Sequence, residues 1–475
     1  MSDVGLLTAA GMEALLDQET IEAFGTGLRG TLLRPGDAGY DEARDVFNVM
    51  IDRRPALIAQ CAGSADVIAA VNFAREHELL MAVRGGGHHV AGNAVCDGGL
   101  VIDLSRMKGL RIDPVRRTAR VEPGLTWGEL NHDLQAFDLG ATGGYISITG
   151  IPGLTLGGGF GWLARKHGLA LDNLLSVDIV TADGQLRTAS PAEHPDLFWG
   201  VRGAGANFGV VVSFEFQVHP VGMVLAGPVI YPLEKAPEVL RFYREYAATA
   251  PDELTSGPLL FSMPPAPFVP PELHGARVVA IPVCYAGSPE VGEQVLQPLR
   301  EFGPPLADFI QLMPFGVAQL SADFLWPPGY HQYWKSSFLP ALSDPAIQTM
   351  VSHFASVPSP LTVVVLDQLG GAISRVGPNE TAFPHRAWPY NLLISSAWAD
   401  PAESERNIRW TREFYAAMEP QLARAIYVNY MYLDDESEQR AREVYGQNSE
   451  RLAELKAKYD PTNLFRLNHD IKASP

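Results

Sequence analysis

The chain has 475 residues, of which 47% are apolar, and its 54 acidic and 36 basic side chains give a formal net charge of -18 at pH 7. This charge disfavours binding to nucleic acid or to an anionic membrane surface, because both would repel the protein. The 45 glycines and 37 prolines exclude a helical bundle or a coiled coil. We therefore expect a soluble, loop-rich protein with at least two domains.

The cysteines and the N-terminus indicate the compartment. Cys61, Cys96 and Cys284 are far apart and lack the Cys-x-x-Cys spacing of a zinc site, so reduced, buried thiols and no metal site are expected. The N-terminus carries Asp3 where a secretory signal needs basic residues, and no compact apolar segment follows. We predict a cytoplasmic protein.

The first 220 residues are predicted to form an α+β unit of short strands and two glycine-rich turns. A helix is expected from Ser64, and a capping box at Thr126 and Glu129 is expected to begin a second helix that ends near residue 137. The predicted strands are 80–83, 100–104, 118–121, two strands around the turn at 183–184, and a strand within 207–219.

Beyond Pro220 the predicted elements become longer, which indicates a second domain. The proline-rich segment 264–271 is predicted to be a stiff surface loop. The predicted strands lie near 225–231, 257–262, 277–285, 361–367 and 391–397, and the predicted helices lie near 236–249, 289–302, 344–356, 402–420 and 450–458.

Residues 139–164 contain no charged side chain, although 26 residues are enough to span a bilayer. Nine of the 26 are glycine, and each glycine in a helix interior costs about 1 kcal/mol relative to alanine. The sequence therefore predicts an uncharged loop in place of a membrane-spanning helix.

Three consecutive glycines occur twice, at 85–87 and at 157–159. Glycine lets backbone amides approach a ligand closely, so such loops can bind a pyrophosphate, but they also form tight turns. Neither triplet precedes the Gly-Lys-Ser/Thr of a Walker loop or fits Gly-x-Gly-x-x-Gly. The triplets alone leave both interpretations open.

Four separated motifs are more specific when they are taken together. They are Arg84-Gly-Gly-Gly-His-His-Val-Ala-Gly-Asn93, Gly157-Gly-Gly-Phe-Gly-Trp162 followed by Leu171-Asp-Asn-Leu174, Asp196-Leu-Phe-Trp-Gly-Val-Arg-Gly-Ala-Gly-Ala-Asn-Phe-Gly209, and Tyr459-Asp-Pro-Thr-Asn-Leu-Phe-Arg-Leu-Asn468. In this order the chain, from about residue 28 to 472, resembles the berberine bridge enzyme-like FAD-linked oxidases of the vanillyl-alcohol oxidase and p-cresol methylhydroxylase superfamily.

The resemblance implies an α+β fold in three parts. Residues 28–220 would form a p-cresol methylhydroxylase-type FAD-binding domain. Residues 221–425 would form a substrate-binding domain of antiparallel sheet flanked by helices, and residues 426–475 would return to the FAD-binding domain.

The resemblance also implies a covalently attached FAD. The tether would be His88, which matches the histidine of the Arg-x-Gly-Gly-His loop of relatives. Many relatives have a second tether, a cysteine four residues before the glycine that matches Gly150, and here Ile146 occupies that position. A single tether is predicted. The implied cofactor-binding residues are Arg84, Gly85, Gly86, Gly87, His88, His89, Gly92, Gly143, Gly144, Ile146, Thr149, Gly150, Gly153, Gly157, Gly158, Gly159, Val177, Val180, Val210 and Asn468.

The chain departs from the relatives near its C-terminus. The motif there commonly reads Asn-Gln-Asn-Ile, whereas this chain reads Asn468-His-Asp-Ile471. Asp470 therefore stands where relatives have their second asparagine.

Two residues are candidates for the catalytic base. Tyr430 matches the tyrosine that ends a Tyr-x-Asn-Tyr segment in several relatives, and on a strand Tyr427 and Asn429 would point away from it. Asp367 interrupts an apolar strand, on the same face as Val365. If that face lines the active site, burial would raise the pKa of Asp367 and let it act as a base; the alternative is a solvated acid at a strand end.

Aromatic residues gather in the second domain, either as core or as walls of a substrate pocket. The residues concerned are Trp326, Tyr330, Tyr333, Trp334 and Tyr390, together with His331. The resemblance implies an oxidase that takes a hydride from an alcohol, amine or activated C–H of a sizeable aromatic or polycyclic metabolite and reduces dioxygen to hydrogen peroxide, in secondary metabolism. The alternatives are a carbohydrate oxidase, a flavin dehydrogenase that does not use dioxygen, and a flavin-carrying binding protein.

Overall fold

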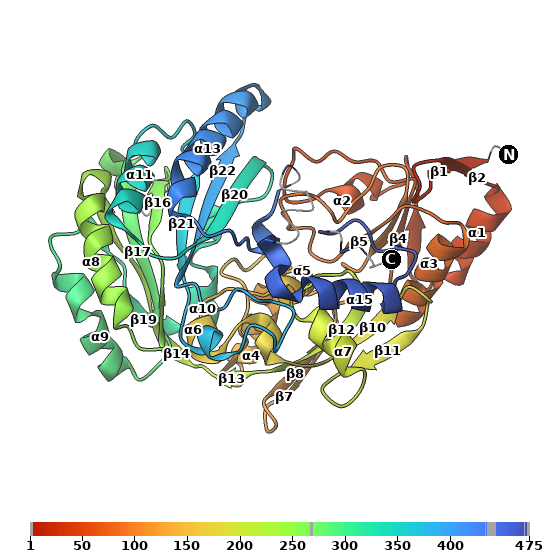
Figure 1. The fold of residues 1–475 in the computed structure, drawn as a ribbon, viewed down its shortest axis with the longest axis horizontal. Helices are drawn as coiled ribbons and strands as arrows, with labels where there is room; N and C mark the ends of the chain where they lie inside the picture. Colours follow the sequence, from red (N-terminus) through yellow and green to blue (C-terminus); the bar gives the residue numbers. More distant parts are fainter. Residues whose placement is uncertain (1–2, 267–268, 433, 435–442, 470, 473–475) are drawn as a thin grey trace.

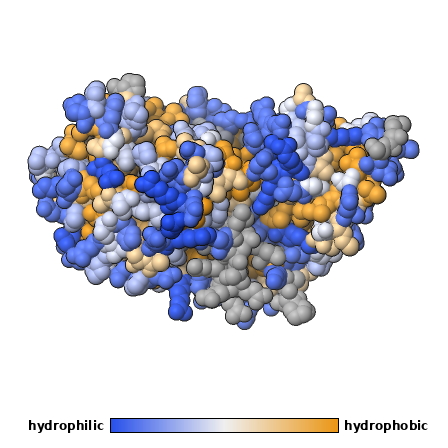
Figure 2. Space-filling view, turned by 90° about the horizontal axis from the view of Figure 1, so that it is seen from above, coloured by the Kyte–Doolittle hydropathy of each residue, from blue (hydrophilic) through white to orange (hydrophobic). Residues whose placement is uncertain are grey.

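The computed structural model describes residues 3–266, 269–432, 434, 443–469 and 471–472. Two units lie side by side, and the C-terminal part of the chain runs back along the first of them (Figure 1). In the face seen in Figure 2, hydrophilic residues are spread over both units, as expected for a strongly acidic chain. Among the described residues, no helix is both long enough and apolar enough to cross a membrane.

A four-stranded sheet leads into the first glycine loop. Two of its pairings, β4 with β6 and β6 with β5, are parallel, because helix α3 (Ser64–Glu76) crosses over between β4 and β5. The last strand, β5, ends at Arg84, directly before the glycines. In sheet order the strands are β3 (Thr31–Leu33), β4 (Leu57–Gln60), β6 (Leu100–Asp103) and β5 (Met81–Arg84).

A five-stranded antiparallel sheet forms the second layer of the first unit. Its strand β10 has two buried faces, because Val177 packs into one apolar core and Val180 packs into the core beneath α3. In sheet order the strands are β11 (Leu186–Ala189), β10 (Leu174–Thr181), β12 (Gly209–Gln217), β8 (Thr118–Val121) and β7 (Leu110–Asp113).

Short elements complete the first unit. The capping box is confirmed, since Thr126 and Glu129 exchange side-chain and backbone hydrogen bonds at the start of α4. The uncharged stretch, residues 139–164, is not wholly a loop as predicted, because it contains the buried helix α5. The elements are β1 (Val4–Leu7), β2 (Glu13–Leu16), β9 (Leu139–Gly140), β13 (His219–Pro220), α1 (Gln18–Gly27), α2 (Tyr40–Arg44), α4 (Trp127–Gln135), α5 (Ile151–Gly157), α6 (Ala164–His167) and α7 (Pro195–Val201).

The second unit is a nine-stranded antiparallel sheet. Figure 1 shows helices α8, α9 and α11 on its outer side. The strands are β14 (Met223–Pro232), β15 (Leu254–Ser256), β16 (Leu259–Ser262), β17 (Arg277–Tyr285), β18 (Ala307–Asp308), β19 (Gln311–Pro314), β20 (His331–Leu339), β21 (Val363–Gln368) and β22 (Tyr390–Trp398). The helices are α8 (Ala236–Ala248), α9 (Pro289–Glu301), α10 (Phe315–Leu320), α11 (Asp344–Phe354), α12 (Ala372–Arg375) and α13 (Ser404–Met418).

The large sheet is buried on both faces. On β21, Val364 and Leu366 pack against the helices, whereas Val363 and Val365 belong to a second apolar cluster on the opposite face. Successive side chains of a strand point to opposite faces, so Asp367 lies on the face of Val365. This face turns toward the first unit and carries the site described below.

Most predicted elements are confirmed, and the differences have local causes. Strand β20 was not predicted, because its sequence is rich in aromatic and polar residues without a clean period of two. The proline-rich segment is not wholly a surface loop, since Val269 is buried in the cluster that includes Val363; residues 267–268 of this segment lie outside the described residues.

The C-terminal helix α15 (Ser449–Tyr459) is fixed to the first unit by a buried ion pair. The ammonium group of Lys456 donates hydrogen bonds to the carboxylate of Asp460 (2.8 Å) and to the backbone oxygens of Asn207 (2.9 Å) and Phe465 (3.0 Å). The side chains of Lys456 and Asp460 are both fully buried. This pair therefore positions the residues that follow it along the chain.

Replacing Lys456 with methionine should destabilise the protein by about 3–5 kcal/mol, because the carboxylate of Asp460 would stay buried without its cation. The matched control is Lys458→Met, which removes an exposed lysine paired with Asp196 and should cost less than about 1 kcal/mol. Thermal unfolding of both variants measures the difference. Equal melting temperatures for the two variants would contradict the structural role of Lys456.

Candidate active site

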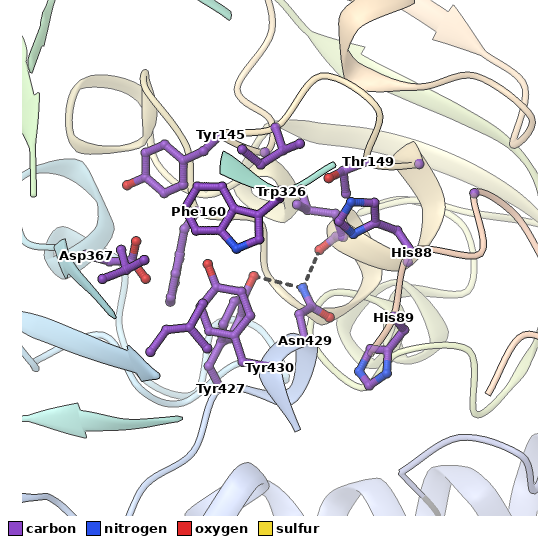
Figure 3. A pocket seen from close by; sticks show the side chains of 18 of the residues that line it. His88, His89, Tyr145, Thr149, Phe160, Trp326, Asp367, Tyr427, Asn429 and Tyr430 are labelled. Atoms are coloured by element: carbon purple, nitrogen blue, oxygen red, sulfur yellow. Dashed lines mark hydrogen bonds between the residues drawn. The ribbon is translucent and has the colours of Figure 1, made fainter. Parts of the chain in front are cut away.

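A cavity of about 560 Å³ lies where the two units and the C-terminal segment meet. The first unit contributes the glycine loop at 85–89, the uncharged stretch and residues 204–211 to its walls. The second unit contributes side chains from its large sheet, and the C-terminal segment contributes residues 427–430 and 468–469. Figure 3 shows the labelled side chains of this cavity.

The two glycine-rich segments of the first unit touch through their backbones. A Cβ atom added to Gly86 would lie 2.7 Å from the Cα atom of Gly150, and a Cβ added to Gly150 would lie equally close to Gly86. No side chain fits at this contact, so bare backbone lines this wall of the cavity. A ligand can therefore approach the main-chain amides closely.

His88 presents a neutral imidazole to the cavity. Its ring stacks on Phe47, with 4.2 Å between the ring centroids, and its Nε2 atom is buried with no hydrogen-bond partner in the described part of the chain. Burial lowers the pKa of His88 to about 4, with a smaller contribution from His89. The unpartnered ring nitrogen is a site at which a cofactor could be bound.

Most of the predicted cofactor residues line this cavity. Those that do are Gly85, Gly86, Gly87, His88, His89, Gly144, Ile146, Thr149, Gly150, Gly153, Val210 and Asn468. The cavity lining does not include Arg84, Gly92, Gly143, Gly157, Gly158, Gly159, Val177 or Val180.

Internal packing explains why these eight residues lie outside the lining. Arg84 donates to the backbone oxygens of Ala43 and Asp45, while Val177 and Val180 point into the two cores beside β10. The glycines of this group allow close packing within the protein. A Cβ on Gly143 would clash with Trp127, one on Gly92 with Ile51, one on Gly157 with Asn429, one on Gly158 with Tyr427, and one on Gly159 with Ala170.

The two candidate bases form one hydrogen-bonded unit. The hydroxyl of Tyr430 donates to the carboxylate of Asp367, which also accepts a hydrogen bond from Nδ2 of Asn391 (3.1 Å). Burial raises the pKa of Asp367 to about 7, although both hydrogen bonds oppose the shift. The solvated acid considered from the sequence is therefore wrong, since Asp367 is only 3% exposed.

Tyr430 is held by a turn and not by the strand that was expected. Residues 428–430 form the 3₁₀ helix η7 (Val428–Tyr430), which brings Tyr427 and Tyr430 together with 4.9 Å between their ring centroids. The hydroxyl of Tyr427 accepts hydrogen bonds from the backbone N–H of Gly159 (2.8 Å) and from Nδ2 of Asn429 (2.8 Å). Tyr427 and Asn429 therefore fix the turn that presents Tyr430.

Burial and the charge of Asp367 raise the pKa of Tyr430 well above its ordinary value. The phenol is thus protonated at neutral pH. Of the two groups, Asp367 is the one whose protonation changes near neutrality.

Sequence reasoning missed aromatic residues of the uncharged stretch. Phe160 stacks on Tyr427 with 4.0 Å between centroids, and Tyr145 meets Trp162 edge to face at 4.9 Å. In Figure 3 the hydroxyl of Tyr145 points toward Asp367. These aromatic residues lie between the glycines of the uncharged stretch. Their presence in a glycine-rich segment was the sequence signal that could have identified them as cavity residues.

Only some of the aromatic residues that were singled out in the second unit line the cavity. Trp326 and Trp334 line the cavity, and their indole N–H groups donate to the side chains of Ser395 and Gln332, both at 3.0 Å. Tyr390 belongs instead to the core beneath the helices, and Tyr333 donates to Asp434 (2.5 Å). The two tryptophans therefore present apolar ring surface to a ligand.

The wall contributed by the second unit has few polar side chains. Apart from the two tryptophans, the described residues there with polar side chains are Ser256, Ser321 and Asp367. Ser256 donates to Gln368 (2.8 Å), and Ser321 donates to a backbone oxygen (2.7 Å). Asp367, together with Tyr430, is thus the polar group available to a ligand on this side.

Comparison with known proteins agrees with this geometry. Residues 55–190 match the family model described as FAD binding domain, and residues 426–472 match the model described as berberine and berberine like. The chain is 31% identical over 459 residues to an FAD-linked oxidoreductase of Dictyostelium discoideum, covering 96% of this chain and 97% of that protein. It is 32% identical to (R)-6-hydroxynicotine oxidase of Paenarthrobacter nicotinovorans, covering 94% and 97%.

Solved structures show the same fold. The crystal structure of 6-hydroxy-D-nicotine oxidase from Arthrobacter nicotinovorans superposes with a TM-score of 0.84 at 28% identity, covering 94% of this chain and 98% of that one. The carbohydrate oxidase of Microdochium nivale gives a TM-score of 0.83 at 26% identity, covering 96% and 100%.

Fold, cavity and sequence thus define an FAD-linked oxidoreductase with the p-cresol methylhydroxylase-type fold. The chain belongs to the berberine bridge enzyme-like FAD-linked oxidases. The residues present fit FAD, because bare glycine backbone and an unpartnered neutral imidazole face the same cavity.

Gly150→Ala should disturb cofactor binding, because the new methyl group would overlap the backbone of Gly86 and force the two loops apart at a cost of about 1–3 kcal/mol. The flavin absorbance per protein measures the effect and should fall. Gly27→Ala is the matched control, since a Cβ there meets open space, and it should retain the wild-type flavin content. A full flavin complement in Gly150→Ala would show that the contact is not required.

Proposed function

We propose that this protein is an oxidase that takes a hydride from an alcohol, amine or activated C–H of a sizeable aromatic or polycyclic metabolite and reduces dioxygen to hydrogen peroxide. The observation that carries the proposal is the Tyr430–Asp367 pair in an otherwise apolar wall of the cavity. We place this reaction in secondary metabolism and in the cytoplasm.

When it is bound, FAD supplies the acceptor for the two electrons that leave the substrate. The protein supplies the route for the proton. The hydroxyl oxygen of Tyr430 takes the proton from the O–H or N–H of the substrate while its own proton moves to the carboxylate of Asp367. Asp367 ends the step protonated, and its pKa of about 7 suits a group that must accept and release a proton near neutrality.

The nature of the walls supports an apolar substrate. A carbohydrate needs several hydrogen-bond partners, because its hydroxyl groups lose their water on binding. The described residues of the second unit offer one such group, Asp367, beside the rings of Trp326 and Trp334. An aromatic or polycyclic substrate therefore fits this chain better than the sugars oxidised by some of its relatives. The proton-accepting pair also favours an enzyme over a flavin-carrying binding protein.

We further propose that FAD is attached through His88 alone. Support comes from Ile146, which lines the cavity at the position of the second tether in relatives. Cys61, Cys96 and Cys284 are free and buried, as predicted, and none of them lines the cavity. No thiol is therefore in place to form a second bond.

Both Asp367→Asn and Tyr430→Phe should lower kcat by about 10²- to 10⁴-fold, because each variant breaks the same proton route. Tyr246→Phe is the matched control; its hydroxyl bonds the backbone of Val295 among the outer helices, and this variant should keep wild-type turnover. Steady-state oxygen consumption measures all three. Full activity in either Asp367→Asn or Tyr430→Phe would rule out the shared route.

The pH profile gives a second check on Asp367. The wild-type kcat/KM should rise with pH through about 7, because the carboxylate is the proton-accepting form and burial has raised its pKa to that value. The rising limb should vanish in Asp367→Asn. The free energy of unfolding should change with pH in the opposite direction to kcat/KM. The pKa of Asp367 is higher in the folded protein than in the unfolded chain, so folding favours the protonated carboxyl group. The wild-type protein should lose stability relative to Asp367→Asn as the pH rises through 7. A wild-type profile that is flat from pH 5 to 9 would exclude Asp367 as the acceptor.

Acid precipitation tests the tether. The wild-type pellet should stay yellow, and the peptide that contains His88 should carry the mass of the flavin. His88→Ala should give a colourless pellet, because no other tether is expected. A yellow pellet from this variant would reveal a second covalent bond.

A further inference from the structure

Two buried histidines contact each other at the wall of the cavity. His89 belongs to the glycine loop and His469 to the C-terminal segment, and both line the cavity. Their Nε2 atoms are 3.3 Å apart, with 5.1 Å between the ring centroids. Burial lowers the pKa of both imidazoles, that of His469 to about 3, so both rings are neutral at physiological pH.

The contacts of His89 fix its tautomer. Its Nδ1 atom accepts a hydrogen bond from the backbone N–H of Ala91 (3.2 Å), so the single proton of the neutral ring must be on Nε2. From there the N–H faces two acceptors, the backbone oxygen of Val428 and Nε2 of His469, both at 3.3 Å.

The tautomer of His469 follows from that of His89. Its Nε2 atom faces a donor and must therefore be the unprotonated acceptor, which puts the proton of the neutral ring on Nδ1. This Nδ1–H group is buried and has no hydrogen-bond partner among the residues that the structure describes. A buried donor without a partner costs about 1–3 kcal/mol, so such a group is expected to be satisfied by a ligand.

The backbone of His469 is also held in place. Its carbonyl oxygen accepts hydrogen bonds from the side-chain amide of Asn207 (3.3 Å) and from the hydroxyl of Tyr445 (3.3 Å). The neighbouring Asn468 donates to the backbone oxygen of Ala206 (3.2 Å). The unpartnered donor therefore has a fixed position at the cavity wall.

We propose that Nδ1–H of His469 donates a hydrogen bond to an acceptor atom of the isoalloxazine of bound FAD, and that His89 is the positioning residue that fixes the required tautomer. The proposal rests on the binding of FAD in this cavity. Relatives commonly carry glutamine at this position, so the imidazole donor is a feature of this chain's own sequence. Asp470, the next residue, lies outside the described residues.

A donor at the isoalloxazine should stabilise the reduced flavin more than the oxidised flavin, because reduction makes the ring acceptors more electron-rich. The predicted consequence is a higher reduction potential. Removing the donor should lower the equilibrium constant for two-electron reduction about tenfold, which corresponds to a fall of about 30 mV.

The first experiment compares the reduction potentials of the flavin-loaded wild type, His469→Leu and His469→Gln by dye equilibration. We expect a lower potential in His469→Leu and a near-wild-type potential in His469→Gln, because the glutamine amide can also donate. His89→Leu should shift the potential in the same direction as His469→Leu, since the tautomer would no longer be fixed. A wild-type potential in flavin-loaded His469→Leu would overturn the proposal.

The second experiment needs no variant. Nitrogen-15 NMR of the histidine-labelled wild-type holoenzyme reports which ring nitrogen carries the proton. We expect the proton of His469 on Nδ1 and that of His89 on Nε2; a proton on Nε2 of His469 would overturn the proposal even if the leucine variant failed to retain flavin. A wild-type protein without flavin would instead contradict the FAD assignment itself.

Discussion

The carboxyl group of Asp367 is buried where three distant segments of the chain meet, and the arrangement of the site follows from that burial. A charged carboxylate in a nearly dry wall is costly unless nearby groups donate hydrogen bonds to it. Asn391 on the neighbouring strand and Tyr430 from the C-terminal segment provide those donors. The C-terminal segment thus supplies one of the two hydrogen bonds that stabilise this buried acid of the second unit.

The burial of Asp367 is also consistent with the lack of charged side chains in the uncharged stretch, residues 139–164. A further charge opposite Asp367 would either pair with it and hold its pKa low, or repel it. Gly150 and its neighbours instead offer backbone, and Phe160 offers a ring that supports Tyr427. The stretch contains both close backbone contacts and a short helix, and most of its residues are buried, so the absence of charge reflects burial.

Sequence reasoning predicted what depends on local signals or on motif resemblance. The capping box of Thr126, the strand Arg277–Tyr285, the family and most of the cavity-lining glycines are examples. It assigned Gly157–Gly159 to cofactor contact; these glycines lie outside the cavity lining, where Gly157 and Gly158 pack against the turn at 427–430 and Gly159 packs against Ala170. Two features depend on contacts between residues far apart in the chain and were not predictable from local pattern: the Tyr430–Asp367 pair and the His89–His469 contact.

The most direct test of this account is the colour of the flavin during a single turnover without air. The protein would be mixed under argon with a panel of aromatic or polycyclic alcohols and amines and, separately, with oligosaccharides, and then exposed to air. We predict bleaching of the yellow flavin by members of the first group alone, with recovery in air and release of hydrogen peroxide. Bleaching by oligosaccharides alone, or bleaching that air does not reverse, would contradict the proposed oxidase of apolar metabolites.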